Sequence, residues 1–198
     1  MTKKVLILPG DGIGQEVTKS SNEILNYLIS EHSLDFEVNT MDVGGTAYDL
    51  HGSPIPSNVL SSAKDSDAIL FGAVGGPKWD DLGWDDRPEQ ALLTLRKELG
   101  LFANLRPAFL FNELASASPI KNNIIEGLDI LIVRELTGGV YFGEPRAIVK
   151  DETPNYAFNT MIYNEDEIRR IAKIGFESAR KRNGKLCSVE KANVLEVS

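Results

Sequence analysis

The sequence is poor in cysteine, since Cys187 is the single one among 198 residues. One thiol cannot form a disulfide within the chain, so a disulfide-stapled scaffold is excluded and a reducing compartment is favoured. The segment around it, KLCSVE, predicts a buried strand. In such a strand Cys187 is a small apolar filler rather than a nucleophile.

Long hydrophobic runs are also missing. No stretch approaches the roughly 18 apolar residues that a membrane span needs. The apolar run after MTKK ends at once in Pro-Gly-Asp-Gly, too soon for a signal peptide. We therefore expect a cytoplasmic protein with no membrane partner.

Basic charge is scarce as well, with 21 Lys+Arg against 29 acidic residues and a net charge of -8. No basic run is present, so no nucleic-acid partner is expected. The two histidines, His32 and His51, are isolated in polar segments. Neither a histidine-driven triad nor a paired Cys/His metal site is therefore indicated.

What is present in the first half is an alternation of strands and helices. The strand 67–74, DAILFGAV, is uniformly apolar, as expected of a parallel strand that is covered on both faces. Such an alternation predicts the α/β class. Strands are expected at 4–8, near 36–38 and at 67–74, and helices at 15–30 and, capped by Ser57, at 57–64.

After Gly100 the pattern becomes α+β, which predicts a separate second lobe. Asn164 and Glu167 have capping-box spacing and open a helix that runs to about Arg182. Its inner stripe is expected to be Ile168, Ile171, Ala172 and Phe176. Strands are expected at 129–133, 139–142, 156–163 and 185–189, and KANVLEVS at the end has the pattern of a helix start.

The turn LPGDGIG follows a strand and opens a helix. Its spacing is G-x-G-x-G and not the Rossmann G-x-G-x-x-G. Glycines still permit a ligand to approach the backbone, and a helix N-terminus favours an anion. The alternative is a tight strand-to-helix turn with no ligand.

A helix that begins after Pro88 places Glu89, Leu92, Leu93 and Arg96 on one face. It can be an ordinary amphipathic helix with Arg96 at its rim. It can also be a pocket floor, with leucines for an alkyl group and a guanidinium for a carboxylate.

Further candidates lie beyond this helix. Arg106 precedes Pro107, and Arg134 ends an apolar strand whose next residue, Glu135, points to the opposite face. Tyr141 is either a cross-strand aromatic or a functional phenol. Lys191 is either a solvated cation or a functional amine.

In their order, these segments resemble one family over essentially the whole chain. LPGDGIGQEV, FGAVGGPKWD, RPEQALLTLRKELGLFANLRPA, VRELTGGVYFGEPR and VEKANVLE are similar to the isocitrate/isopropylmalate dehydrogenase family of β-decarboxylating dehydrogenases. The Glu-x-x-Leu-Leu-x-Leu-Arg helix resembles the isopropylmalate branch. The resemblance implies an α/β, isopropylmalate-dehydrogenase-like two-lobed fold that is not a Rossmann fold, of which this chain is the N-terminal part.

The resemblance also implies roles for the substrate-facing residues. Arg96, Arg106 and Arg134 bind the carboxylates, and Leu92 and Leu93 contact the isopropyl group. Lys191 takes part in deprotonating the C2 hydroxyl as hydride leaves for NAD. Tyr141 then protonates the enol that remains after loss of carbon dioxide.

The cofactors implied are NAD and Mg²⁺ or Mn²⁺. The resemblance places the metal ligands beyond residue 198, so no metal residue is expected here. It implies that NAD contacts Ile13, Ala73, Val74, Gly75, Gly76, Glu89 and Asn193.

The implied activity is NAD-dependent oxidative decarboxylation of 3-isopropylmalate to 2-oxoisocaproate in leucine biosynthesis. Residues 1–100 are the first segment of a split α/β domain, and residues 101–198 begin a dimer-forming lobe. Within that lobe an arm around 139–163 crosses to the partner of a homodimer. We expect a chain truncated at its C-terminus to be inactive alone. The alternatives are a related enzyme for tartrate or homoisocitrate, or a non-catalytic fragment that dimerises or binds a dicarboxylate.

Overall fold

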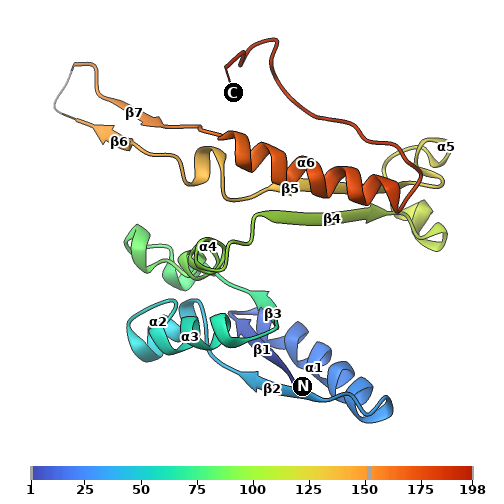
Figure 1. Cartoon of the computed structure of the whole chain (residues 1–198). Coiled ribbons are helices and arrows are strands. Elements are labelled where there is room, and N and C mark those ends of the chain that lie inside the picture. Colours follow the sequence, from blue (N-terminus) through green and yellow to red (C-terminus); the bar gives the residue numbers. More distant parts are fainter. Residues whose placement is uncertain (1, 151–152, 198) are drawn as a thin grey trace. The chain divides into compact units, whose positions relative to one another are not determined.

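The computed structural model describes residues 2–150 and 153–197. The chain divides into two compact units, Met1–Leu99 and Gly100–Ser198 (Figure 1). Among the described residues, no helix combines the length and the apolar character needed to cross a lipid bilayer.

The first unit is built on a parallel sheet. Strand β1 (Lys3–Gly10) lies between β2 (Phe36–Thr40) and β3 (Ala68–Ala73), in the order β2-β1-β3. Parallel neighbours need crossover connections, which the helices supply. The helices are α1 (Ile13–Glu31), α2 (Gly45–His51), α3 (Ser57–Asp65) and α4 (Glu89–Glu98), with 3₁₀ turns at Pro77–Trp79 and Trp84–Asp86.

The main core cluster of this unit lies on one face of β1, and Ile7 is buried on the other face. Leu6 and Leu8 alternate along the strand and are fully buried, because α3 and α4 pack over them. The core cluster is Leu6, Leu8, Val43, Val59, Ala63, Ala91 and Leu95. The alternation of strand and helix confirms the predicted α/β pattern.

Three details of the first unit differ from the prediction. Ser57 is not the cap of α3: Pro56 holds the N-cap position, and no side chain caps that end. Helix α2 was not predicted, because it is short and starts at a glycine pair that also fits a turn. Strand β3 is exposed at its first residue and otherwise half-buried rather than fully buried, although Ile69 and Phe71 pack on the core cluster and Gly72 lies against Thr18 of α1 on the other face.

The second unit pairs its strands antiparallel. Strand β4 (Ala103–Phe109) pairs with β5 (Asp129–Glu135), and β6 (Arg146–Val149) pairs with β7 (Tyr156–Asn159). Helix α6 (Glu165–Arg180) begins with the predicted capping box, in which Asn164 and Glu167 each accept from the other's backbone N–H. The remaining elements are α5 (Asn122–Ile125) and 3₁₀ turns at Asn112–Ala117 and Gly139–Tyr141.

Two predicted strands of this unit are wrong. Residues 139–142 form a 3₁₀ turn, because Gly139 adopts a φ of 78° that extended strands do not use. Residues 185–189 form no strand, and Cys187 is exposed rather than a buried filler. The predicted helix start near the end of the chain is a single turn at residues 191–195, in which the N–H of Leu195 donates to the Lys191 carbonyl, and no helix forms over residues 191–197.

The predicted inner stripe of α6 is wrong for three of its four residues, since Ile171 is half-buried while Ile168, Ala172 and Phe176 are exposed. Ile168 is 56% exposed and Phe176 is 62% exposed, whereas Gly175 and Ala179 are buried. Small side chains on the packed face let a helix approach its neighbour closely. Ile168 and Phe176 therefore lie on the outer side of the helix, whereas Ile171 and Ile174 are half-buried beside Gly175.

Candidate functional site

The three parallel strands of the first unit end at one edge of their sheet. Gly10 of β1 pairs with Ala73 of β3, and Asp11 follows directly. In open α/β sheets, ligands bind outside the carboxyl ends of the strands. The predicted cofactor segments at Ile13 and at 73–76 both lie at this edge.

Asp11 is the central polar group of the edge. Its side chain is 2% exposed, and both carboxylate oxygens accept hydrogen bonds. Oδ2 accepts from the backbone N–H groups of Gly45 at 2.8 Å and Gly75 at 2.9 Å. Oδ1 accepts from the backbone N–H of Thr46 at 2.7 Å and from its hydroxyl at 2.9 Å. One carboxylate thus joins the segments that follow all three strands.

The structure brings several predicted cofactor residues together. A Cβ on Gly75, whose φ is 106°, would lie 2.8 Å from Oε1 of Glu89, so the Glu89 carboxylate lies against the Gly75 backbone. A Cβ on Gly14 would lie 2.6 Å from the backbone nitrogen of Ala73. The exposed Ile13, one residue before, therefore opens α1 beside this loop. A backbone this bare of side chains suits close approach of a dinucleotide.

A second set of contacts holds the same loop further along. The indole Nε1 of Trp79 donates to Asp49 of α2 at 3.2 Å, and Lys78 Nζ donates to Asp49 at 2.5 Å. These two donors hold the pKa of Asp49 below its usual range. A Cβ on Gly45 would lie 2.2 Å from the Trp79 ring, so the indole packs on bare backbone. The connection from β3 to α4 is therefore fixed to α2 as well as to Asp11.

Helix α4 buries a different face from the one with the predicted substrate residues. Ala91 and Leu95 are in the core, whereas Leu92, Leu93 and Arg96 are half-buried and lie outside the core cluster. Glu89 is exposed at the first position of the helix. The side chains of Leu92 and Leu93 are therefore not part of the core cluster of the first unit.

Arg106 and Arg134 lie on one face of the β4–β5 ladder. Asn104 is the cross-strand partner of Arg134, and Arg106 follows two residues later on the same strand. The Nε of Arg106 donates to Asn104 Oδ1 at 2.6 Å. The Arg134 guanidinium lies 5.3 Å from the centroid of the Tyr141 ring. The second unit thus gathers three predicted residues, and Asn104, which was not predicted, orients one of them.

The other face of this ladder carries a separate ion pair. Glu135 accepts from Arg170 Nη2 at 2.9 Å and from the backbone and hydroxyl of Thr137 at 2.9 and 2.8 Å. Arg170 also lies 4.6 Å from the centroid of the Phe102 ring. The prediction that Glu135 points away from Arg134 is therefore confirmed, because Glu135 is engaged with α6.

The remaining candidates lie in other parts of the chain. Lys191 and Asn193 belong to an exposed turn of the second unit, in which the Lys191 carbonyl accepts from the N–H groups of Val194 and Leu195. Arg96 belongs to the first unit. Convergence of Arg96, Arg106 and Arg134 on one substrate stays a prediction.

A metal site does not emerge from the described part of the chain, where no group of three or more His, Cys, Asp or Glu side chains could hold an ion.

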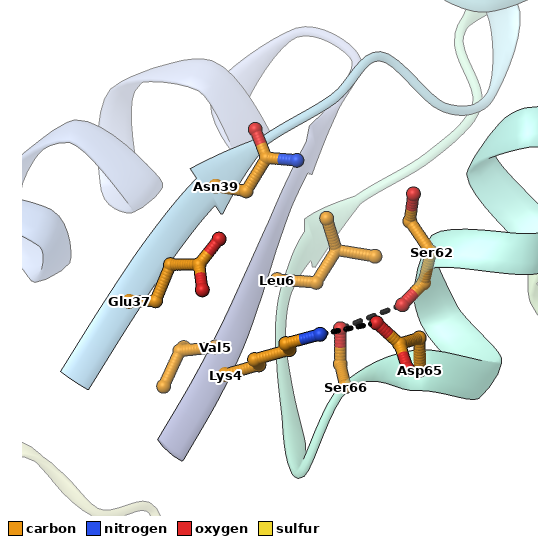
Figure 2. A pocket seen from close by; sticks show the side chains of 8 residues that line it. All are labelled: Lys4, Val5, Leu6, Glu37, Asn39, Ser62, Asp65 and Ser66. Carbon is orange, nitrogen blue, oxygen red and sulfur yellow. Dashed lines mark hydrogen bonds and ion pairs between the residues drawn. The ribbon is translucent and has the colours of Figure 1, made fainter. Parts of the chain in front are cut away.

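Figure 2 shows a small polar cavity of the first unit, of about 90 Å³. It is lined by β1, β2 and the end of α3, and lies toward the amino end of β1, where Lys4 Nζ donates to Asp65 at 2.5 Å. That is the opposite edge of the sheet from Asp11, so this cavity is not the candidate site.

Comparison with known proteins identifies the family to which the sequence is similar. The sequence pattern of the family described as "Isocitrate/isopropylmalate dehydrogenase" matches residues 4–198. A 3-isopropylmalate dehydrogenase of Hydrogenovibrio crunogenus is 56% identical over the whole chain, which covers 56% of that protein. One of Paramagnetospirillum magneticum is 53% identical over 98% of the chain and 53% of its own length. The chain thus spans about half the length of these relatives.

A solved structure agrees with the sequence relatives. The crystal structure of a β-decarboxylating dehydrogenase from Thermococcus kodakarensis is 32% identical, with a TM-score of 0.66. The match covers 98% of this chain and 51% of that one. The predicted dehydrogenase-like α/β fold is thereby confirmed.

Proposed function

Since this chain belongs to the isocitrate/isopropylmalate dehydrogenase family, we propose that it takes part in the NAD-dependent oxidative decarboxylation of 3-isopropylmalate to 2-oxoisocaproate. This is the reaction of leucine biosynthesis that the names of its relatives indicate. The observation that carries the proposal is the pair of guanidiniums, Arg106 and Arg134, on one face of the β4–β5 ladder beside Tyr141. Two adjacent cations suit a dicarboxylate better than they suit a neutral alcohol.

The substrate has two carboxylates, one hydroxyl and a branched alkyl group. Arg96, Arg106 and Arg134 bind the carboxylates, because a planar guanidinium can pair with both oxygens of a carboxylate. Leu92 and Leu93 contact the isopropyl group. Their position outside the core cluster supports this role, since their side chains are not needed for the packing of α4.

The chemistry that NAD would supply when bound is a hydride acceptor for C2 of the substrate. Gly75 and Gly76 offer bare backbone to the cofactor, and Ile13 and Glu89 lie beside that backbone; Asn193 contributes from the second unit. Lys191 takes the proton of the C2 hydroxyl during oxidation. After carbon dioxide has left C3, the Tyr141 hydroxyl donates a proton to that carbon.

The proposal is tested with the polypeptide encoded by the complete reading frame, by following NADH absorbance with 3-isopropylmalate and Mn²⁺. We expect turnover, and we expect R134K to lower kcat/KM about 100-fold, because lysine cannot reproduce a two-point contact with a carboxylate. Absence of NAD reduction by the unchanged protein would contradict the proposal.

Substrate preference provides a second test. Changing Leu92 and Leu93 to serine should reduce kcat/KM for 3-isopropylmalate at least tenfold, since apolar contact with the isopropyl group is lost. The same change should alter malate turnover by less than about twofold, because malate lacks the alkyl group. Equal losses for both substrates would show that the leucines do not contact the isopropyl group.

A further inference from the structure

Both oxygens of the Asp11 carboxylate accept two hydrogen bonds each. Three of its four hydrogen bonds come from backbone N–H groups: Gly45 and Thr46 begin α2, and Gly75 lies in the loop after β3. An ionised carboxylate only accepts, so it can satisfy all four donors at once. A neutral amide of the same shape must turn its NH₂ group toward at least one backbone N–H.

The glycines around Asp11 leave room for this arrangement. A Cβ on Gly44, whose φ is 78°, would lie 2.5 Å from Asp11 Oδ2. A Cβ on Gly10 would lie 2.0 Å from the carbonyl oxygen of Ala73. The backbone N–H of Asp11 itself donates to that Ala73 oxygen at 2.6 Å. Asp11 therefore makes two hydrogen bonds to the 73–76 loop. Its backbone N–H donates to Ala73, and its side chain accepts from Gly75.

We infer that Asp11 is a positioning residue for the cofactor: through the Gly75 N–H it holds the 73–76 loop where NAD binds. This inference rests on the proposed function. Gly75 has a carboxylate on each side, with Asp11 on its N–H and Glu89 against its Cα position. When the Asp11 bond is lost, both Gly75 and its contact with Glu89 shift. Helix α4 stays in place, because Ala91 and Leu95 still hold it in the core, so Leu92, Leu93 and Arg96 keep their positions.

The test compares D11N with D65N in the polypeptide encoded by the complete reading frame. Asp65 lies in the same unit and loses the same charge, but it pairs with Lys4 at the opposite edge of the sheet. In D11N we expect KM for NAD to rise at least fivefold, while kcat at saturating NAD and KM for 3-isopropylmalate change less than twofold. In D65N all three values should stay within twofold of the unchanged protein.

T46V serves as a second variant that keeps the three backbone contacts and removes the hydroxyl donor. Its KM for NAD should rise two- to threefold. If D11N does not fold, an unchanged KM for NAD in T46V overturns the inference. If D11N folds, a parallel rise of both KM values, or a fall in kcat alone, also overturns it. Absence of NAD reduction in the unchanged protein overturns the proposed function and this inference together.

Discussion

At the scale of single residues, the hydrogen-bond donors around Glu135 lower its pKa by more than burial raises it. Its side chain is 9% exposed, and burial by itself would raise its pKa. Hydrogen bonds from Arg170 and Thr137 act in the opposite direction and hold the pKa of Glu135 below its usual range. The charged form is therefore favoured in the folded second unit.

Replacing this carboxylate tests its contribution to stability. E135Q should lower the free energy of unfolding by about 2 kcal/mol at neutral pH, because Arg170 loses its charged partner. A folded-state pKa below the unfolded value means that this stabilisation is complete above about pH 4.3 and is lost as the pH falls further. Urea unfolding at a series of pH values measures both effects.

The matched control is E165Q on α6, the helix that carries Arg170. Glu165 pairs with Arg169, but both side chains are more than 70% exposed. An exposed pair contributes at most about 1 kcal/mol, so E165Q should be nearly neutral at every pH. A difference between unchanged protein and E135Q that persists undiminished at low pH would contradict the role of ionised Glu135.

At the scale of elements, the N-terminal ends of α3 and α6 can be compared directly, because a side-chain cap was predicted for both. Asn164 caps α6 with reciprocal hydrogen bonds, whereas Ser57 is the first helical residue of α3 and caps nothing. N164A should lower the free energy of unfolding by about 1 kcal/mol, and S57A should change it by less than about 0.5 kcal/mol. Chemical denaturation of both variants measures the difference. Equal effects would mean that the capping box does not stabilise α6.

Elements whose signal is local were predictable. The capping box needs only Asn164 and Glu167, three residues apart, and β1 is an apolar run closed by Pro9 and Gly10. The side of α6 that packs was not predictable, because an apolar stripe does not reveal that Gly175 and Ala179 make the closer contact.

The candidate site likewise contains residues that the sequence predicted and one that it did not. The arginines and Tyr141 stand in recognisable segments, and the ladder register then places Arg106 and Arg134 on one face. The role of Asp11 was not predictable, because its partners are 34 to 64 residues away. An acidic residue between two glycines at a strand-to-helix turn was the available signal.

At the scale of the whole molecule, net negative charge makes copies of the chain repel one another, whereas exposed apolar side chains favour their association. The charge is -8 near neutral pH and the isoelectric point is about 4.9. Large apolar side chains such as Ile124, Ile148 and Phe176 are exposed in the described part of the chain. We expect light scattering to be low at about pH 8 and to rise steeply near pH 5, because repulsion between molecules vanishes there. Constant scattering over that range would contradict this expectation.

The strand order β2-β1-β3 has a consequence for synthesis on the ribosome. The strand translated first becomes the middle of the sheet, so pairing spreads outward to both sides of it. Its first neighbour is finished at Thr40 and its second at Ala73, before Gly100 has been added to the nascent chain. The parallel ladder that carries Asp11 thus has all its strands available before translation reaches the second unit.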